Sequence, residues 1–201
     1  TANVTINVNE TPSLVSVTPT SSTVCSGSTV GANASGGSFT STYLADTFDA
    51  LSSQFTAATV SGTTTTTATL NTSVQSQGTG SVLFNTTGVS SEATYSLNSN
   101  VNLTGATTAS LTFSHIAAME SPTTSFDFGY VEYSADGGTT WTTFTSSNYS
   151  GTASTGVFSG SDVRFSTMSY PDWITAFTGT TSLPTNANWK NETFTIPAAA
   201  L

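Results

Sequence analysis

The side chains that could do chemistry are few in this sequence. His115 is its only histidine and Cys25 its only cysteine. His115 shares one face of an expected strand with Leu111 and Phe113, because residues two apart lie on the same side of a strand. A catalytic histidine needs a placed nucleophile or an orienting carboxylate, and the chain contains neither a G-x-S-x-G nor an H-E-x-x-H motif. We therefore expect His115 to be structural and the protein not to be an enzyme.

Carboxylates form a second group of candidates, since a pair about 5 to 10 Å apart could hydrolyse a glycosidic bond. Asp136 is accounted for by a turn, and Glu132 alternates with Val131 and Tyr133, which directs it to solvent. No motif selects a pair, so a glycosidase is not predicted. The candidates are Glu120, Asp127, Glu132, Asp136, Asp172 and Glu192.

Aromatic side chains could contact a ligand, because exposed rings can stack on sugars. Trp141 and Trp189 follow strand patterns and are expected in the core. Tyr170 and Trp173 lie in the loop-like stretch SYPDWIT and are the candidate ligand-binding residues. Inward packing of both rings, which would anchor a long loop, is favoured over ligand binding.

Charge is sparse and one-sided. The 201 residues include Lys+Arg 2 and Asp+Glu 11, a net charge of -9. Nucleic acids and anionic membranes are excluded as partners, because no basic surface can be built. Ser, Thr, Asn and Gly replace charge, as is typical of extracellular bacterial surface proteins.

Cys25 is either a half-buried thiol or the partner of a cysteine elsewhere. With no targeting or membrane-spanning run, we expect a mature or excised portion of a secreted protein.

Short strands separated by turns, without a long amphipathic helical pattern, predict an all-β sandwich. A stretch rich in Gly, Ser and Asn at 31–42 predicts a linker. The chain then divides into an N-terminal strand segment with its linker, 1–42, and a sandwich, 43–201. Within 109–144, Asp136-Gly137-Gly138 predicts a hairpin turn. The other expected strands are 2–8, 14–17, 54–60, 65–70, 81–85, 93–97 and 192–196.

The order of motifs from residue 43 onward is similar to a jelly-roll module of secreted bacterial proteins, related in architecture to MAM and concanavalin-like sandwiches. Such modules recur in type IX secretion cargo, surface adhesins and domains appended to secreted hydrolases. Residues 1–35 resemble a junction between Ig-like repeats, where a VTINVN-TP strand precedes VCSGSTV. The jelly-roll motifs are DTFDA, GSVLFNTTG, LTGATTASLTFSH, FDFGYVEYSADGGTTWTTF, SYPDWIT and PTNANWKNETFTIP.

The resemblance implies a jelly-roll-like antiparallel β-sandwich with an N-terminal strand segment. In that family further strands follow the last motif, so we expect a sandwich that lacks its final strand unless another chain supplies it. The resemblance also implies a structural calcium ion near the first strand, with Asp46 and Asp49 of DTFDA as candidate ligands. The alternative is two solvated loop carboxylates, because no D-x-D-x-D-G loop is present.

Two functions fit these observations. The first is a non-catalytic extracellular structural or adhesive protein, a cell-surface filament subunit or adhesin module. Its N-terminal strand ANVTINV would complete the sheet of another copy or of a neighbouring domain by β-strand addition. The alternative is a carbohydrate-binding module of a secreted multidomain hydrolase, with glycans as partners. The first is favoured, because the ends of the chain suggest continuity with other domains.

Overall fold

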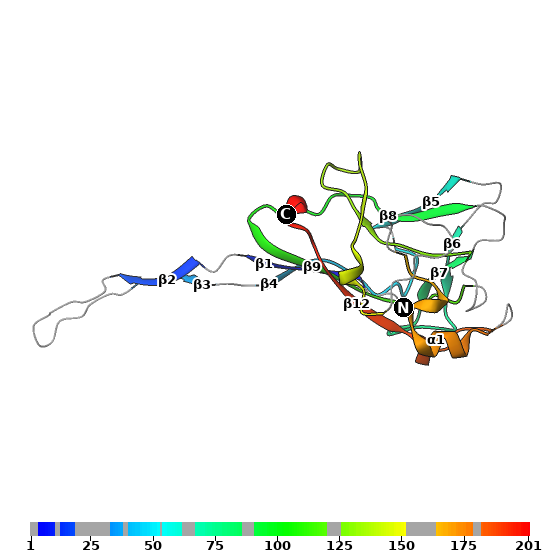
Figure 1. Ribbon diagram of the computed structural model, residues 1–201. Coiled ribbons are helices and arrows are strands. Elements are labelled where there is room, and N and C mark those ends of the chain that lie inside the picture. Colours follow the sequence, from blue (N-terminus) through cyan, green and yellow to red (C-terminus); the bar gives the residue numbers. More distant parts are fainter. Residues whose placement is uncertain are drawn as a thin grey trace, which may run out of the picture.

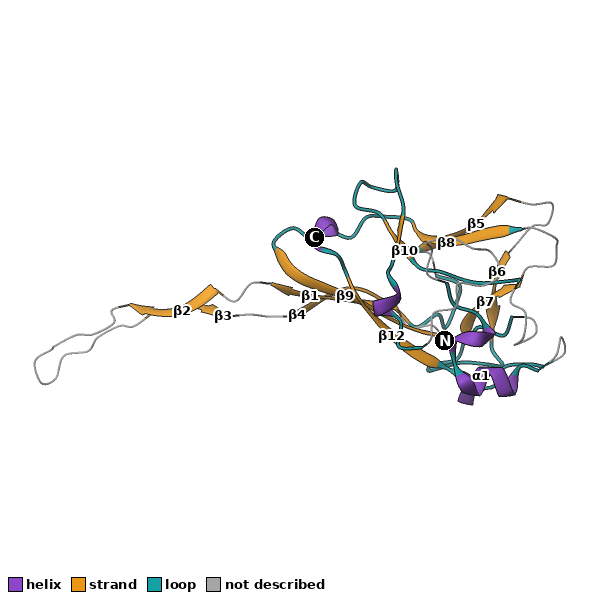
Figure 2. Cartoon of the chain, in the orientation of Figure 1, coloured by secondary structure: helices purple, strands orange, loops and turns teal. Residues whose placement is uncertain are grey.

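The computed structural model is an all-β protein built from antiparallel sheets, as predicted. Strands and loops make up most of it, and its helices are short (Figure 2). Cys25 and Glu120 lie outside the described part of the chain. The structure describes residues 4–10, 13–18, 33–37, 40–52, 54–61, 67–85, 91–119, 126–151, 164–178 and 182–201.

A long two-stranded ribbon extends from the body (Figure 1). At its base β1 (Val4–Glu10) pairs antiparallel with β4 (Thr40–Asp46). Farther out β2 (Ser13–Thr18) pairs with β3 (Asn33–Gly37). These four strands are called the β-ribbon below.

The β-ribbon corrects the predicted linker at 31–42, because β3 and the start of β4 lie there. Asn33–Gly37 contains no large apolar residue, so its sequence carries no strand signal. Its extended form rests on backbone pairing with β2, which side-chain propensity does not report. The division of the chain at residue 42 stays a prediction, and β1 and β4 pair across it.

The largest sheet has the order β12-β9-β1-β4. β9 (Ala106–His115) is its longest strand, and β12 (Lys190–Thr195) lies beside it. β1 occupies the position between β9 and β4, with Ile6 opposite Leu111 on one side and opposite Leu44 on the other. The N-terminal strand is therefore paired on both edges within its own chain.

Smaller sheets complete the body. A predicted turn is confirmed where β10 (Glu132–Tyr133) and β11 (Thr142–Thr143) form a hairpin. Gly137 and Gly138 there have φ of 74° and 91°, the left-handed conformation that glycine permits. The strands predicted at 54–60, 81–85 and 93–97 are also confirmed, and that at 65–70 over its described part. They are β5 (Phe55–Ser61) paired with β8 (Glu92–Leu97), and β6 (Thr67–Asn71) paired with β7 (Ser81–Asn85).

Helical turns lie mainly in the C-terminal half. The α-helix α1 (Pro171–Ala176) has proline in its first turn, where the missing N–H costs nothing. No helix among the described residues is long and apolar enough to span a membrane. The 3₁₀ helices are η1 (Ser146–Asn148), η2 (Thr167–Ser169), η3 (Asn186–Asn188) and η4 (Ala198–Ala200).

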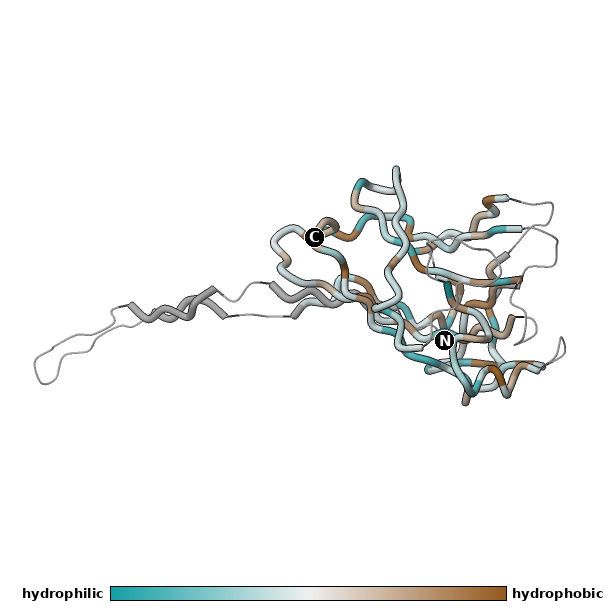
Figure 3. Tube along the Cα trace, viewed as in Figure 1, coloured by the Kyte–Doolittle hydropathy of each residue, from teal (hydrophilic) through white to brown (hydrophobic). Residues whose placement is uncertain are grey.

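The core lies against the largest sheet. Along β12, Glu192 and Phe194 are buried while Asn191, Thr193 and Thr195 are exposed, the period-two pattern of a half-buried strand. Apolar and polar positions are interspersed along most strands of the body (Figure 3). The jelly-roll arrangement itself stays a prediction. The buried apolar clusters are Leu44 with Ala109; Phe144 with Tyr149 and Phe194; and Ala117 with Trp173 and Phe177.

Candidate functional site

A buried carboxylate on β12 gathers the chemistry-bearing side chains of the body. Glu192 is 1% exposed. Its Oε1 lies 3.2 Å from His115 Nε2 and accepts a 2.5 Å hydrogen bond from the Tyr170 hydroxyl. Its Oε2 accepts from the Ser150 backbone N–H at 2.8 Å and from Ser150 Oγ at 2.7 Å. We call Glu192, His115, Tyr170 and Ser150 the Glu192 cluster.

Hydrogen bonds keep Glu192 ionised in this buried position. Burial raises its pKa, since a charged group loses hydration there. The donors His115, Tyr170 and Ser150 outweigh that effect and bring the pKa of Glu192 down to about 2. One sequence signal points to this site: Glu192 stands two residues before Phe194, on the same side of a strand, so it faces the core.

The Glu192 cluster is not arranged as a nucleophile with its base. Ser150 donates to the carboxylate, its Oγ lies 2.8 Å from the Tyr170 hydroxyl oxygen, and it makes no hydrogen bond with His115. In a serine hydrolase the serine would donate to the imidazole. A carboxylate with a pKa of about 2 is also a weak base at neutral pH. The hydrogen bonds of the Glu192 cluster instead connect β9 and β12 with the loops that carry Ser150 and Tyr170.

His115 sits in an aromatic box with little access to solvent. Its ring centroid lies 4.6 Å from that of Phe165 and 5.2 Å from that of Trp173, both edge-to-face. Its side chain is 10% exposed. Within the described residues its Nδ1 has no hydrogen-bond partner. These contacts fit the structural role predicted from the sequence.

The two predicted ligand-binding residues lie together, but they are not both accessible. Trp173 is 0% exposed and donates from Nε1 to the Asn188 carbonyl at 2.7 Å. For Trp173 the structure therefore shows the inward-packed arrangement rather than an exposed ring. The sequence held a signal for this: Trp173 and Phe177 are spaced i, i+4 after Pro171, which puts both on one face of a short helix. Phe177 is 2% exposed.

Tyr170 is half-buried and engaged on several sides. Its ring lies 4.7 Å from that of Trp173, and Lys190 Nζ lies 5.1 Å from its centroid. Burial, and after it the hydrogen bond to Glu192, raise the pKa of Tyr170 to about 12. The tyrosine is thus a neutral donor to Glu192 at neutral pH. A sugar stacked on this ring would have to displace Lys190 or Trp173.

The structure contradicts the expectation that Trp141 lies in the core. Its side chain is 50% exposed beside the β10–β11 turn.

The turn between β10 and β11 forms as predicted. Asp136 accepts from the Thr139 and Thr140 backbone N–H groups at 3.0 and 2.8 Å. Hydrogen bonds from Thr140 and Ser134 bring the pKa of Asp136 down to about 2.

Asp46 and Asp49, the two predicted calcium ligands, each accept hydrogen bonds from loop residues. Asp46 accepts from the Phe48 backbone N–H at 2.8 Å. Asp49 accepts from Thr47 Oγ1 at 2.9 Å and from the backbone N–H of Thr79, which is the main cause of its lowered pKa. Among the described residues no group of three His, Cys, Asp or Glu could hold a metal ion, and the calcium site at Asp46 and Asp49 stays a prediction.

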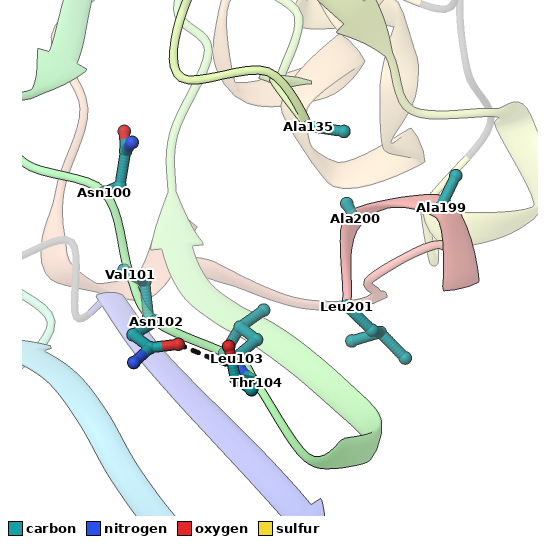
Figure 4. Close-up of a pocket in the computed structure, with 9 residues that line it drawn as sticks. All are labelled: Asn100, Val101, Asn102, Leu103, Thr104, Ala135, Ala199, Ala200 and Leu201. Atoms are coloured by element: carbon teal, nitrogen blue, oxygen red, sulfur yellow. Dashed lines mark hydrogen bonds between the residues drawn. The ribbon is translucent and has the colours of Figure 1, made fainter.

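A hollow of about 360 Å³ opens beside residues 199–201 (Figure 4). Asn102 Oδ1 in its wall accepts from the Thr104 backbone N–H at 3.0 Å. The lining holds amides and small apolar groups but no charged side chain, and we assign it no ligand. It is formed by residues 100–104, Ala135 and residues 199–201.

The position of β1 in the largest sheet is the remaining candidate for function. Ile196 N–H donates to the Ala109 carbonyl, so the odd-numbered residues of β9 direct their backbone groups to β12. The even-numbered residues, among them Ser110 and Thr112, therefore direct theirs to β1. Removing β1 would leave these groups and the inner edge of β4 without a strand.

Searches against family models, curated proteins and solved structures found no match for the chain.

Proposed function

We propose that the protein is a non-catalytic extracellular structural or adhesive subunit of the cell surface, which assembles with copies of itself through β-strand addition. The observation that carries the proposal is the position of β1. A strand from one end of the chain fills the gap between β9 and β4, and it pairs with both. A sheet built in this way can take the same strand from another molecule.

Composition supports the extracellular and adhesive part of the proposal. Serine, threonine, asparagine and glycine replace charge over most of the chain, and only 6% of its residues are charged. The Glu192 cluster supports the non-catalytic part, because its donors stabilise a carboxylate rather than activate Ser150. The carbohydrate-binding alternative has less support, because Trp173 is buried and Tyr170 is half-buried.

Strand complementation tests this function. We expect a variant that lacks residues 1–12 to lose stability, because the edges of β9 and β4 that face β1 become unpaired. A synthetic peptide of residues 1–12 should bind this variant and restore its thermal unfolding midpoint. The restoration can be followed by circular dichroism, and the binding by fluorescence anisotropy of a labelled peptide.

The control is the same peptide with Asn7→Pro. Asn7 is opposite Ser110, whose backbone faces β1, so proline there removes a ladder hydrogen bond. Equal binding of both peptides, or no binding of either to a folded variant, would contradict addition at this position.

A further inference from the structure

We propose that β1 is exchanged between copies, so that β1 of one molecule occupies the position between β9 and β4 of the next. This inference rests on the proposed function and specifies its donor strand, its acceptor and its closed state. In the closed monomer β1 fills its own sheet in the register Ile6 opposite Leu111 and Leu44. In the exchanged form the same register is made between two molecules.

The connection between β1 and β4 is long enough for exchange. Residues 11–39 join the two strands and include the paired strands β2 and β3, which must separate before this connection can extend to its limit of about 95 Å. No residue from 11 to 45 is charged.

The outer edge of β12 is a poorer acceptor than the β1 position. Its odd-numbered residues direct their backbone groups away from β9. The Thr195 N–H donates to Asn148 Oδ1 at 3.0 Å, and the Asn191 carbonyl accepts from Ser150 Oγ at 3.3 Å. Side chains of residues 148–150 thus cover both ends of this edge. An added strand would have to displace them, whereas exchange of β1 displaces an identical strand.

The exchange should be slow and should need concentrated protein. Both forms contain the same pairs in the sheet, so they differ mainly in the entropy of joining molecules. The tethered strand has an effective concentration on the order of millimolar, which favours the closed monomer in dilute solution. Unfolding and refolding at about 1 mM protein lets the intermolecular pairing compete.

A disulfide that locks β1 in place tests the exchange. Val8 and Ala109 are opposite each other, and the backbone of Ala109 faces β12, so they form a non-hydrogen-bonded pair with Cα atoms about 4.5 Å apart. In a Cys25→Ser background, the oxidised Val8→Cys/Ala109→Cys variant should stay monomeric after refolding oxidised at high concentration. The reduced variant should assemble, as measured by sedimentation velocity.

The matched control is Ser110→Cys/Thr195→Cys, a non-hydrogen-bonded pair between β9 and β12 that leaves β1 free. Oxidised, this control should assemble like the Cys25→Ser parent. If the oxidised lock assembles as well as the parent, exchange of β1 is refuted, while the proposed self-assembly stands through another edge. If the parent does not assemble at any concentration, both proposals fail. Circular dichroism of the oxidised and reduced lock verifies that each is folded.

Discussion

At the residue scale, Glu192 is a buried carboxylate that holds several polar groups of the body together. Its carboxylate accepts from Tyr170, from Ser150 twice and from His115. We expect Glu192→Gln to lower the free energy of unfolding by about 2–4 kcal/mol, because the new amide group points a donor at existing donors. Chemical denaturation followed by tryptophan fluorescence measures this change. Asp172→Asn, at an exposed pair with Lys190, should cost less than about 1 kcal/mol.

The same carboxylate makes stability depend on pH. The pKa of Glu192 is about 2 in the folded protein, below its ordinary value of 4.5, so protons bind the unfolded chain more readily. Its contribution is complete above about pH 4.5 and is lost as the pH falls towards 2. Glu192→Gln should therefore lose less stability than the wild type between about pH 5 and pH 3. Parallel losses in both proteins would show that Glu192 does not carry this dependence.

At the element scale, local chemistry and long-range pairing differ in how far the sequence predicts them. The β10–β11 turn was predicted because Asp136, Gly137 and Gly138 carry its whole conformation. β1 was predicted as a strand from its alternating pattern. Its place between β9 and β4 was not predicted, because nothing in the sequence around Thr5 or Thr112 indicates that these two residues pair. β3 was missed because its pairing is by backbone alone. The inward packing of Trp173 had only a weak sequence signal, because its i, i+4 spacing with Phe177 covers a single helical turn.

Asp49 joins its own loop to the loop at Gly78 and Thr79, and two glycine variants test how much this connection contributes. Gly78 and Gly105 both have positive φ, at 66° and 89°. A methyl group on Gly105 meets nothing within 4 Å, whereas one on Gly78 overlaps the Asp49 carboxylate that accepts from Thr79. Gly105→Ala should cost about 1–2 kcal/mol from backbone strain alone. Gly78→Ala should cost more than Gly105→Ala, because it also breaks the Asp49 contacts.

Thermal denaturation of the two glycine variants measures the difference. An equal loss in both would mean that Asp49 contributes little to this loop. If the prediction holds, Asp49→Asn in the Gly78→Ala background should cause almost no further loss of stability, because Gly78→Ala has already removed the Asp49 contacts.

At the scale of the whole molecule, the β-ribbon and the body share one sheet, so the assembly proposed here joins bodies that carry the same charge. Each copy has a net charge of -9. The approach of two copies is therefore opposed by repulsion that acts over the screening length. That length falls from about 30 Å at 0.01 M salt to about 8 Å at 0.15 M. The uncharged β1–β4 connection adds no repulsion of its own.

Raising the sodium chloride concentration from about 0.01 M to about 0.15 M at neutral pH should therefore lower the protein concentration at which half of the chains are assembled. Sedimentation velocity after refolding at each salt concentration measures this midpoint. The oxidised Val8→Cys/Ala109→Cys variant should stay monomeric at both, because salt removes repulsion but cannot release a tethered strand. A midpoint that rises with salt would mean that attraction between charges, rather than strand exchange between like-charged bodies, holds the copies together.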